Sequence, residues 1–101
     1  MMSDEMVRRI ADTHIRAKNP DNWDGRAGES RNFDPYPASY PLDRDTDIMI
    51  KFIHDEDGWG HEVSIRNRRT GTMLSRCTGY GIDSPQNLAD SILDAIRDIP
   101  K

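Results

Sequence analysis

Residues 46–80 decide the fold, and they read TDIMIKFIHDEDGWGHEVSIRNRRTGTMLSRCTGY. Three segments within them either alternate apolar with polar side chains or are rich in β-branched and aromatic residues, as strands are. These segments are 46–54, 61–68 and 72–80. Glycine-containing turns separate the segments, at 55–60 and at 69–71. The stretch therefore predicts a three-stranded antiparallel β-meander.

The two turns also predict which residues face each other across the strands. If the first turn is centred on residues 57 and 58, the expected pairs are Phe52 with Val63, Ile50 with Ile65, and His54 with His61. If Gly71 occupies a bulge, the second turn pairs Ile65 with Ser75 and Val63 with Cys77. Together these registers predict a buried face made of Ile48, Ile50, Phe52, Val63, Ile65, Met73 and Cys77.

The opposite face of the meander mixes cations with aliphatic side chains. Its members are Met49, Lys51, Ile53, Glu62, Ser64, Arg66, Arg68, Leu74 and Arg76. A fully solvated face carries fewer aliphatic residues, so we expect something to cover part of this one. The alternatives are the segment 19–45, a second copy of the chain in a homodimer, or another partner.

Amphipathic helices flank the meander. Residues 4–18 carry apolar side chains three and four positions apart, and Asn19-Pro20 ends the pattern. A second helix is expected to begin with Ser84 as its cap and Pro85 at its first position, and to end before Pro100. Its apolar side chains are Leu88, Ala89, Ile92, Leu93, Ile96 and Ile99.

Residues 19–45 contain four prolines and few aliphatic residues, and we expect them to form an irregular arm. Trp23, Phe33, Tyr36 and Tyr40 within the arm are expected to pack down as short anchors. The predicted architecture is α-β-β-β-α, in the α+β class. Residues 1–101 are expected to form one small domain.

Composition excludes several classes of protein. The 101 residues are 35% hydrophobic and 32% charged, with 14 Lys and Arg against 18 Asp and Glu. No apolar run approaches the length that crosses a bilayer, and the N-terminus does not resemble a signal peptide, so we expect no membrane association. A single cysteine excludes an internal disulfide framework and favours a reducing, cytoplasmic setting.

The first candidate site is basic. It consists of Arg66, Arg68, Arg69 and Arg76, in a stretch without acidic residues between 63 and 80. Such a cluster on one sheet face and its turn can contact phosphates or an acidic protein. The net charge of -4 argues against nucleic acid, because binders of DNA and RNA are usually basic overall.

The second candidate site is acidic. Asp90, Asp94 and Asp98 are four residues apart, so they stack along one face of the last helix and can meet a basic partner. Asp55, Glu56 and Asp57 form a second acidic group in the first turn. Solvated helix faces and turns often carry such charges without any binding role.

No decisive catalytic or cofactor motif is present. His54 and His61 face each other on the predicted register, but two histidines do not complete a zinc site, so we expect no metal and no other cofactor. Cys77 lies on the predicted buried face, where a thiol is usually inert. The chain is therefore not expected to be an enzyme.

Two short motifs resemble double-stranded RNA-binding domains over roughly residues 46–96. The run 58–61, Gly-Trp-Gly-His, is similar to the Gly-Pro-x-His turn of that family, and 79–81 followed by Ser84 is similar to its Gly-x-Gly-x-Ser run. The order of helix, three strands and helix is also similar. The resemblance implies a nucleic-acid-binding module. Where the family has phosphate-binding lysines, this chain has Pro85, Gln86 and Asp90.

Two functions follow from these observations. Small size and acidic charge favour a non-catalytic protein-interaction module, similar to the inhibitor or accessory proteins of phages and mobile elements that act on nucleic-acid-handling complexes. Such a module would present carboxylates where phosphates bind. The alternative is nucleic-acid binding through the arginine face.

Overall fold

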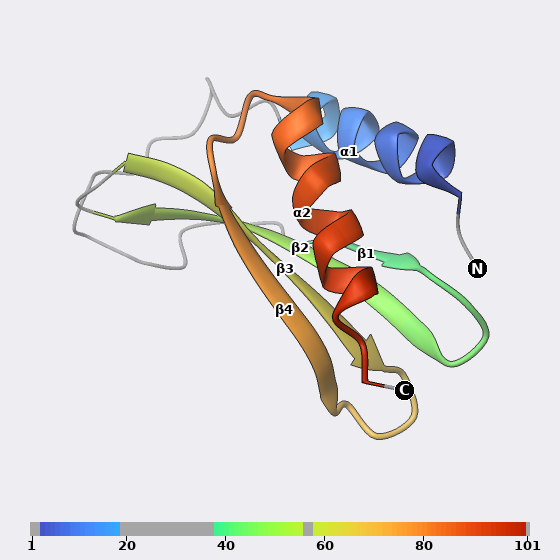
Figure 1. Ribbon diagram of the computed structural model, residues 1–101. Coiled ribbons are helices and arrows are strands. Elements are labelled where there is room, and N and C mark those ends of the chain that lie inside the picture. The colour runs from blue at the N-terminus through green and yellow to red at the C-terminus, as the bar shows by residue number, and fades with distance from the viewer. Residues whose placement is uncertain (1–2, 19–37, 56–57, 101) are drawn as a thin grey trace.

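The computed structural model describes residues 3–18, 38–55 and 58–100. In chain order its elements are α1 (Asp4–Lys18), β1 (Ala38–Pro41), β2 (Thr46–Asp55), β3 (Gly58–Asn67), β4 (Met73–Tyr80) and α2 (Pro85–Arg97). The strands form one antiparallel sheet in the order β1-β2-β3-β4. Both helices lie on the same side of this sheet (Figure 1). The predicted α+β class is therefore confirmed.

Both helices begin where the sequence predicts, because a serine caps each one. The Ser3 hydroxyl accepts a hydrogen bond from the Met6 backbone N–H at 3.3 Å, and Ser84 accepts one from Asn87 at 3.2 Å. Helix α2 ends at Arg97, with Asp98 as its C-cap, shortly before Pro100. No helix in the described part of the chain is long and apolar enough to span a membrane.

The prediction of three strands is wrong, because the sheet has four. The additional strand, β1, lies within the stretch 19–45 that was expected to be irregular, and residues 19–37 of that stretch lie outside the described residues. β1 pairs with β2, where Tyr40 faces Ile48. Four residues ending in Pro41 are too few to show a strand pattern. Pro41 is tolerated because an edge strand pairs on one side only.

The predicted register of the first hairpin is also wrong, by two residues. Phe52 faces His61 rather than Val63, and His54 faces Trp59 rather than His61. Likewise, Ile50 faces Val63 and Ile48 faces Ile65. The last pair of the hairpin is Asp55 with Gly58, so the centre of the turn lies one residue nearer the N-terminus than predicted. A shift of two preserves side-chain faces, so the predicted division into two faces still holds for β2 and β3.

The predicted register of the second hairpin is confirmed, since Ile65 faces Ser75 and Val63 faces Cys77. Beyond Ile65 the register shifts, and Met73 pairs with Arg66. Met73 was expected on the buried face, but its side chain is 42% exposed. The bulge pairs Met73 with Arg66, so the Met73 side chain lies on the sheet face that carries Arg66 rather than on the buried face.

The core lies between the sheet and the two helices. Its fully buried strand residues are Ile48, Ile50, Phe52, Val63 and Ile65. The helices add Val7 and Ala11 of α1 and Leu88, Ala89, Ile92 and Ala95 of α2, and Ile82 adds to the core from the segment between β4 and α2. The sheet face opposite the helices, called the open face below, is covered by no helix or strand among the described residues (Figure 1).

Candidate interaction surfaces

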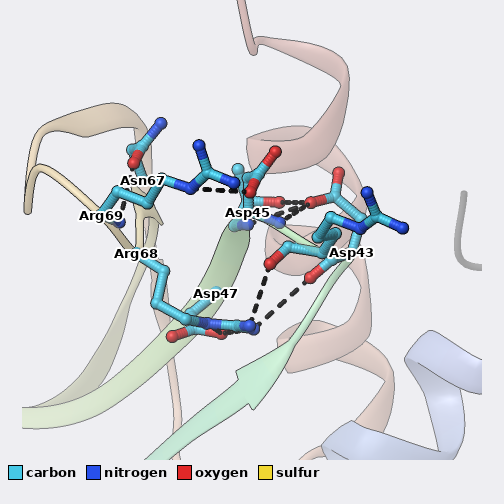
Figure 2. Close-up of polar contacts among 8 residues, drawn as sticks. Asp43, Asp45, Asp47, Asn67, Arg68 and Arg69 are labelled. Carbon is cyan, nitrogen blue, oxygen red and sulfur yellow. Dashed lines mark hydrogen bonds and ion pairs between the residues drawn. The ribbon is translucent and has the colours of Figure 1, made fainter.

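The predicted basic cluster is divided in the structure, because two of its arginines are held by aspartates. Arg68 donates to the Asp47 carboxylate through Nη2 at 2.5 Å and through Nε at 3.1 Å. It also donates to the backbone carbonyl of Arg44 at 3.0 Å (Figure 2). Arg69 forms an ion pair with Asp45 at 3.3 Å. The positive charge of this turn is therefore largely compensated within the chain.

The aspartates of this turn are themselves fixed by local hydrogen bonds. One carboxylate oxygen of Asp43 accepts from the backbone N–H of Asp45 at 2.9 Å and from the Thr46 hydroxyl at 2.7 Å. The hydrogen bond from Thr46 is the largest cause that lowers the pKa of Asp43. Similarly, the hydrogen bond from Arg68 lowers the pKa of Asp47. The 43–47 turn is thus a preformed acidic counterpart to Arg68 and Arg69.

Sequence reasoning missed this compensation, although the alternating aspartates at 43, 45 and 47 were a visible signal. They precede the arginines by more than 20 residues, and only sheet pairing brings the two groups together. The register places Thr46 opposite Asn67, and so brings the turn before β2 next to the turn after β3.

The other two arginines, Arg66 and Arg76, belong to the open face. Arg76 is exposed and faces Ser64 across the strands, whereas Arg66 is half-buried and faces Asp47. The Nε atom of Arg66 is buried without a hydrogen-bond partner among the described residues. Tyr80, at the end of β4, is 81% exposed. Met49 and Ile53 of the same face are half-buried rather than exposed, whereas Leu74, which was expected on this face, packs against the core at the bulge.

A hollow of about 210 Å³ lies where β3 begins and β4 ends. It is lined by Ile53, Gly58, Trp59, Gly60, Thr78, Gly79 and Tyr80. This lining contains no carboxylate, histidine or lysine, so it provides no acid–base pair. Across the described residues, no group of three or more His, Cys, Asp or Glu side chains is placed to hold a metal ion.

The predicted acidic stripe lies along α2 as the helical spacing requires. Gln86 donates to the Asp90 carboxylate at 2.8 Å, and Arg97 donates to Asp94 at 2.8 Å. Arg97 also lies 3.9 Å from Asp98. Arg97 is thus the one cation paired with these three carboxylates among the described residues, so the stripe keeps a net negative charge. The other predicted acidic group cannot be assessed, because Glu56, Asp57 and the Asp55 side chain lie outside the described part.

A buried hydrogen-bond network fixes α2 over β4. His61 of β3 is 1% exposed, and its Nε2 lies 2.6 Å from the Ser91 hydroxyl of α2. Its Nδ1 lies 3.0 Å from the Gly81 carbonyl. That carbonyl only accepts, so Nδ1 carries the proton and Nε2 accepts from Ser91. Both side chains are buried, so this serine–histidine pair is inaccessible to a substrate.

Gly79 allows this network to form, because the His61 ring crosses β4 at that position. A Cβ atom on Gly79 would lie 2.5 Å from His61 Nε2 and 2.7 Å from Ser91 Oγ. The register of β3 and β4 places His61 opposite Gly79. The contact with Ser91 depends on the docking of α2 and had no signal in the sequence.

The free energy of unfolding is expected to fall as pH is lowered through the range where His61 titrates. Burial lowers the pKa of His61 below its ordinary value of 6.5. Between the lowered pKa and about 6.5, the unfolded chain binds more protons than the folded one, so stability rises with pH. Urea unfolding between about pH 5 and 7.5 should show this slope. A His61→Gln variant should show a shallower slope, and equal slopes would contradict the assignment.

The edge strands of the sheet differ in their capacity to pair with a further strand. β1 has four residues and ends in Pro41, which has no backbone N–H. β4 has eight residues and no proline, and no described strand pairs with its outer side. Unpaired edges of this length are templates for strand addition.

Comparisons of the chain with protein-family models, curated proteins and solved structures found no match. The likeness to double-stranded RNA-binding domains therefore receives no support from them. The additional strand β1 is a departure from the α-β-β-β-α order that this likeness implies.

Proposed function

We propose that this chain is a small, non-catalytic module that binds a protein partner. The observation that carries the proposal is the eight-residue outer edge of β4, which pairs with no described strand and lies beside α2, the helix of the acidic stripe. An edge strand supplies backbone hydrogen bonds, and the stripe supplies charge that selects a basic partner. Contacts between α2 and β4 support this proposal, because the helix that carries Asp90, Asp94 and Asp98 packs next to that strand.

The partner we propose belongs to a nucleic-acid-handling complex. Its basic surface would meet carboxylates where it otherwise meets phosphates, as expected for an inhibitor or accessory protein of the phage type. A cytoplasmic location is part of this proposal, because the single cysteine suits a reducing compartment.

Nucleic-acid binding is the second candidate, and one observation favours it. Arg66 and Arg76 share the open face with the exposed Tyr80, and Arg66 Nε has no partner among the described residues. Arginines and an aromatic ring on a sheet are suited to backbone contact and base stacking. We rank this candidate second because Arg68 and Arg69 are engaged by Asp47 and Asp45.

Affinity capture with and without nuclease distinguishes the two candidates. Three forms of the tagged chain are compared: wild type, Asp94→Lys/Asp98→Lys, and Arg66→Ala/Arg76→Ala. We expect the wild-type chain to capture a protein in stoichiometric amount, and nuclease treatment should not release it. The same protein should bind the arginine variant equally well and the aspartate variant at least about tenfold more weakly. Recovery of nucleic acid alone, lost with Arg66 and Arg76, would establish the second candidate instead.

A further inference from the structure

We infer that the partner contributes an extended segment that pairs with the outer edge of β4 and carries Lys or Arg at alternate positions. This inference rests on the proposed protein-binding function and specifies its geometry. It follows from three features: which backbone groups of β4 point outward, how much space lies above them, and which charges border that space.

The outward backbone groups follow from the β3–β4 register. Gly81 N–H donates to the Trp59 carbonyl at 3.0 Å, which makes that pair a hydrogen-bonded one. Hydrogen-bonded pairs recur at every second residue of an antiparallel ladder, so Gly79 and Cys77 also bond to β3. The N–H and C=O groups of the intervening residues therefore point to the outer side. These residues are Arg76, Thr78 and Tyr80.

The space above this edge is bordered by small side chains. Ser75, Cys77 and Gly79 are the β4 residues on the α2 side of the sheet. An added strand would place alternate side chains beside them, on the same side. Because these three residues are small, they leave room for long side chains to reach from the added strand toward α2.

The carboxylates that border this space belong to the β4 side of α2. The Ser91 hydroxyl lies beside Gly79, and the Ala95 carbonyl accepts a hydrogen bond from Ser75, so Ser91 and Ala95 mark that side. Asp94 and Asp98 follow these two residues by three positions each, and neighbours at that spacing share a helix face. Figure 1 shows α2 running alongside β4, with α1 on its other side.

The spacing of these charges matches an extended segment. Asp94 and Asp98 are separated by a rise of about 6 Å along the helix. Alternate residues of a strand are separated by about 6.6 Å. Two basic residues at alternate positions can therefore each meet one carboxylate. A second copy of this chain is a poor occupant, because two-fold pairing of β4 would bring the acidic sides of two α2 helices together.

The test uses two synthetic peptides with blocked ends, TKVKVKT and TEVEVET, and a matched pair of variants. Thr78→Pro removes an outward N–H but leaves the β3–β4 hydrogen bonds intact, and Thr78→Val keeps the N–H. Binding is measured by calorimetry at low salt. We expect the basic peptide to bind wild type and Thr78→Val, and to bind Thr78→Pro and Asp94→Asn/Asp98→Asn at least about tenfold more weakly. The acidic peptide should not bind.

If Thr78→Pro fails to fold, amide hydrogen exchange measured on the wild-type chain with and without peptide still tests the inference. The basic peptide should slow exchange at Arg76, Thr78 and Tyr80, whose N–H groups point outward. Unchanged exchange there, equal binding by Thr78→Pro, or equal binding of both peptides would overturn the inference. A dimer of the free chain that Thr78→Pro dissociates would also overturn it. Capture of a protein partner unaffected by Thr78→Pro would leave the proposed function standing while this inference fails.

Discussion

Replacing Phe52 with alanine is expected to lower the free energy of unfolding by about 3–5 kcal/mol. The Phe52 side chain is fully buried, and its ring meets that of His14 of α1 edge-on, with centroids 4.9 Å apart. Truncation removes apolar burial and leaves a cavity between α1 and the sheet. Since domains of this size are stable by roughly 5–15 kcal/mol, the loss is a large fraction of the total. Urea unfolding followed by circular dichroism measures it.

Ile53→Ala is the matched control for this prediction. Ile53 is the next residue of β2, but it is half-buried and lies on the open face beside the hollow. We expect this variant to lose about 1–2 kcal/mol, because part of its side chain is already in water. Equal losses for the two variants would contradict the assignment of a single buried face to β2.

Replacing Gly79 with alanine is expected to cost about 2–4 kcal/mol of stability. The new methyl group would occupy the space where the His61 ring crosses β4 to reach Ser91. Either the ring is displaced and its hydrogen bond to Ser91 is lost, or α2 moves away from β4. The same network sets the position of α2 beside the edge of β4, so peptide binding should weaken as well.

A double-mutant cycle with His61→Ala tests the reason for this cost. When the ring is absent, the nearest atom that remains to the methyl group at Gly79 is the Ser91 hydroxyl oxygen, which can rotate away. The substitution at Gly79 should then cost less than about 1 kcal/mol, which corresponds to a coupling of 1–3 kcal/mol between the two sites. Additive losses would show that the destabilisation does not arise from the contact with His61.

The candidate sites differ in how far sequence reasoning could predict them. Spacing along one helix was sufficient for Asp90, Asp94 and Asp98, because i, i+4 neighbours share a face in any helix. The arginine cluster was defined by proximity in the sequence, and sheet pairing brought Asp45 and Asp47 to Arg69 and Arg68. The outer edge of β4, which pairs with no described strand, had no sequence signal, since edge position depends on the order of all strands.

The sequence by itself determined the two helices and the Ser84 cap, the register of the second hairpin up to its bulge, and which residues of β2 and β3 face the core. Each of these depends on interactions between residues a few positions apart, or on a period of two or 3.6 that a short segment displays. A register error of two residues in the first hairpin left the faces unchanged for the same reason.

Only the tertiary structure decided the fourth strand, the exposure of Met73, the pairing of Arg68 with Asp47, and the contact between His61 and Ser91. Each of these depends on segments that are distant in sequence and meet only after the sheet has formed and α2 has docked. Local propensity carries no information about such contacts, because their free energy is gained only when the intervening chain is ordered.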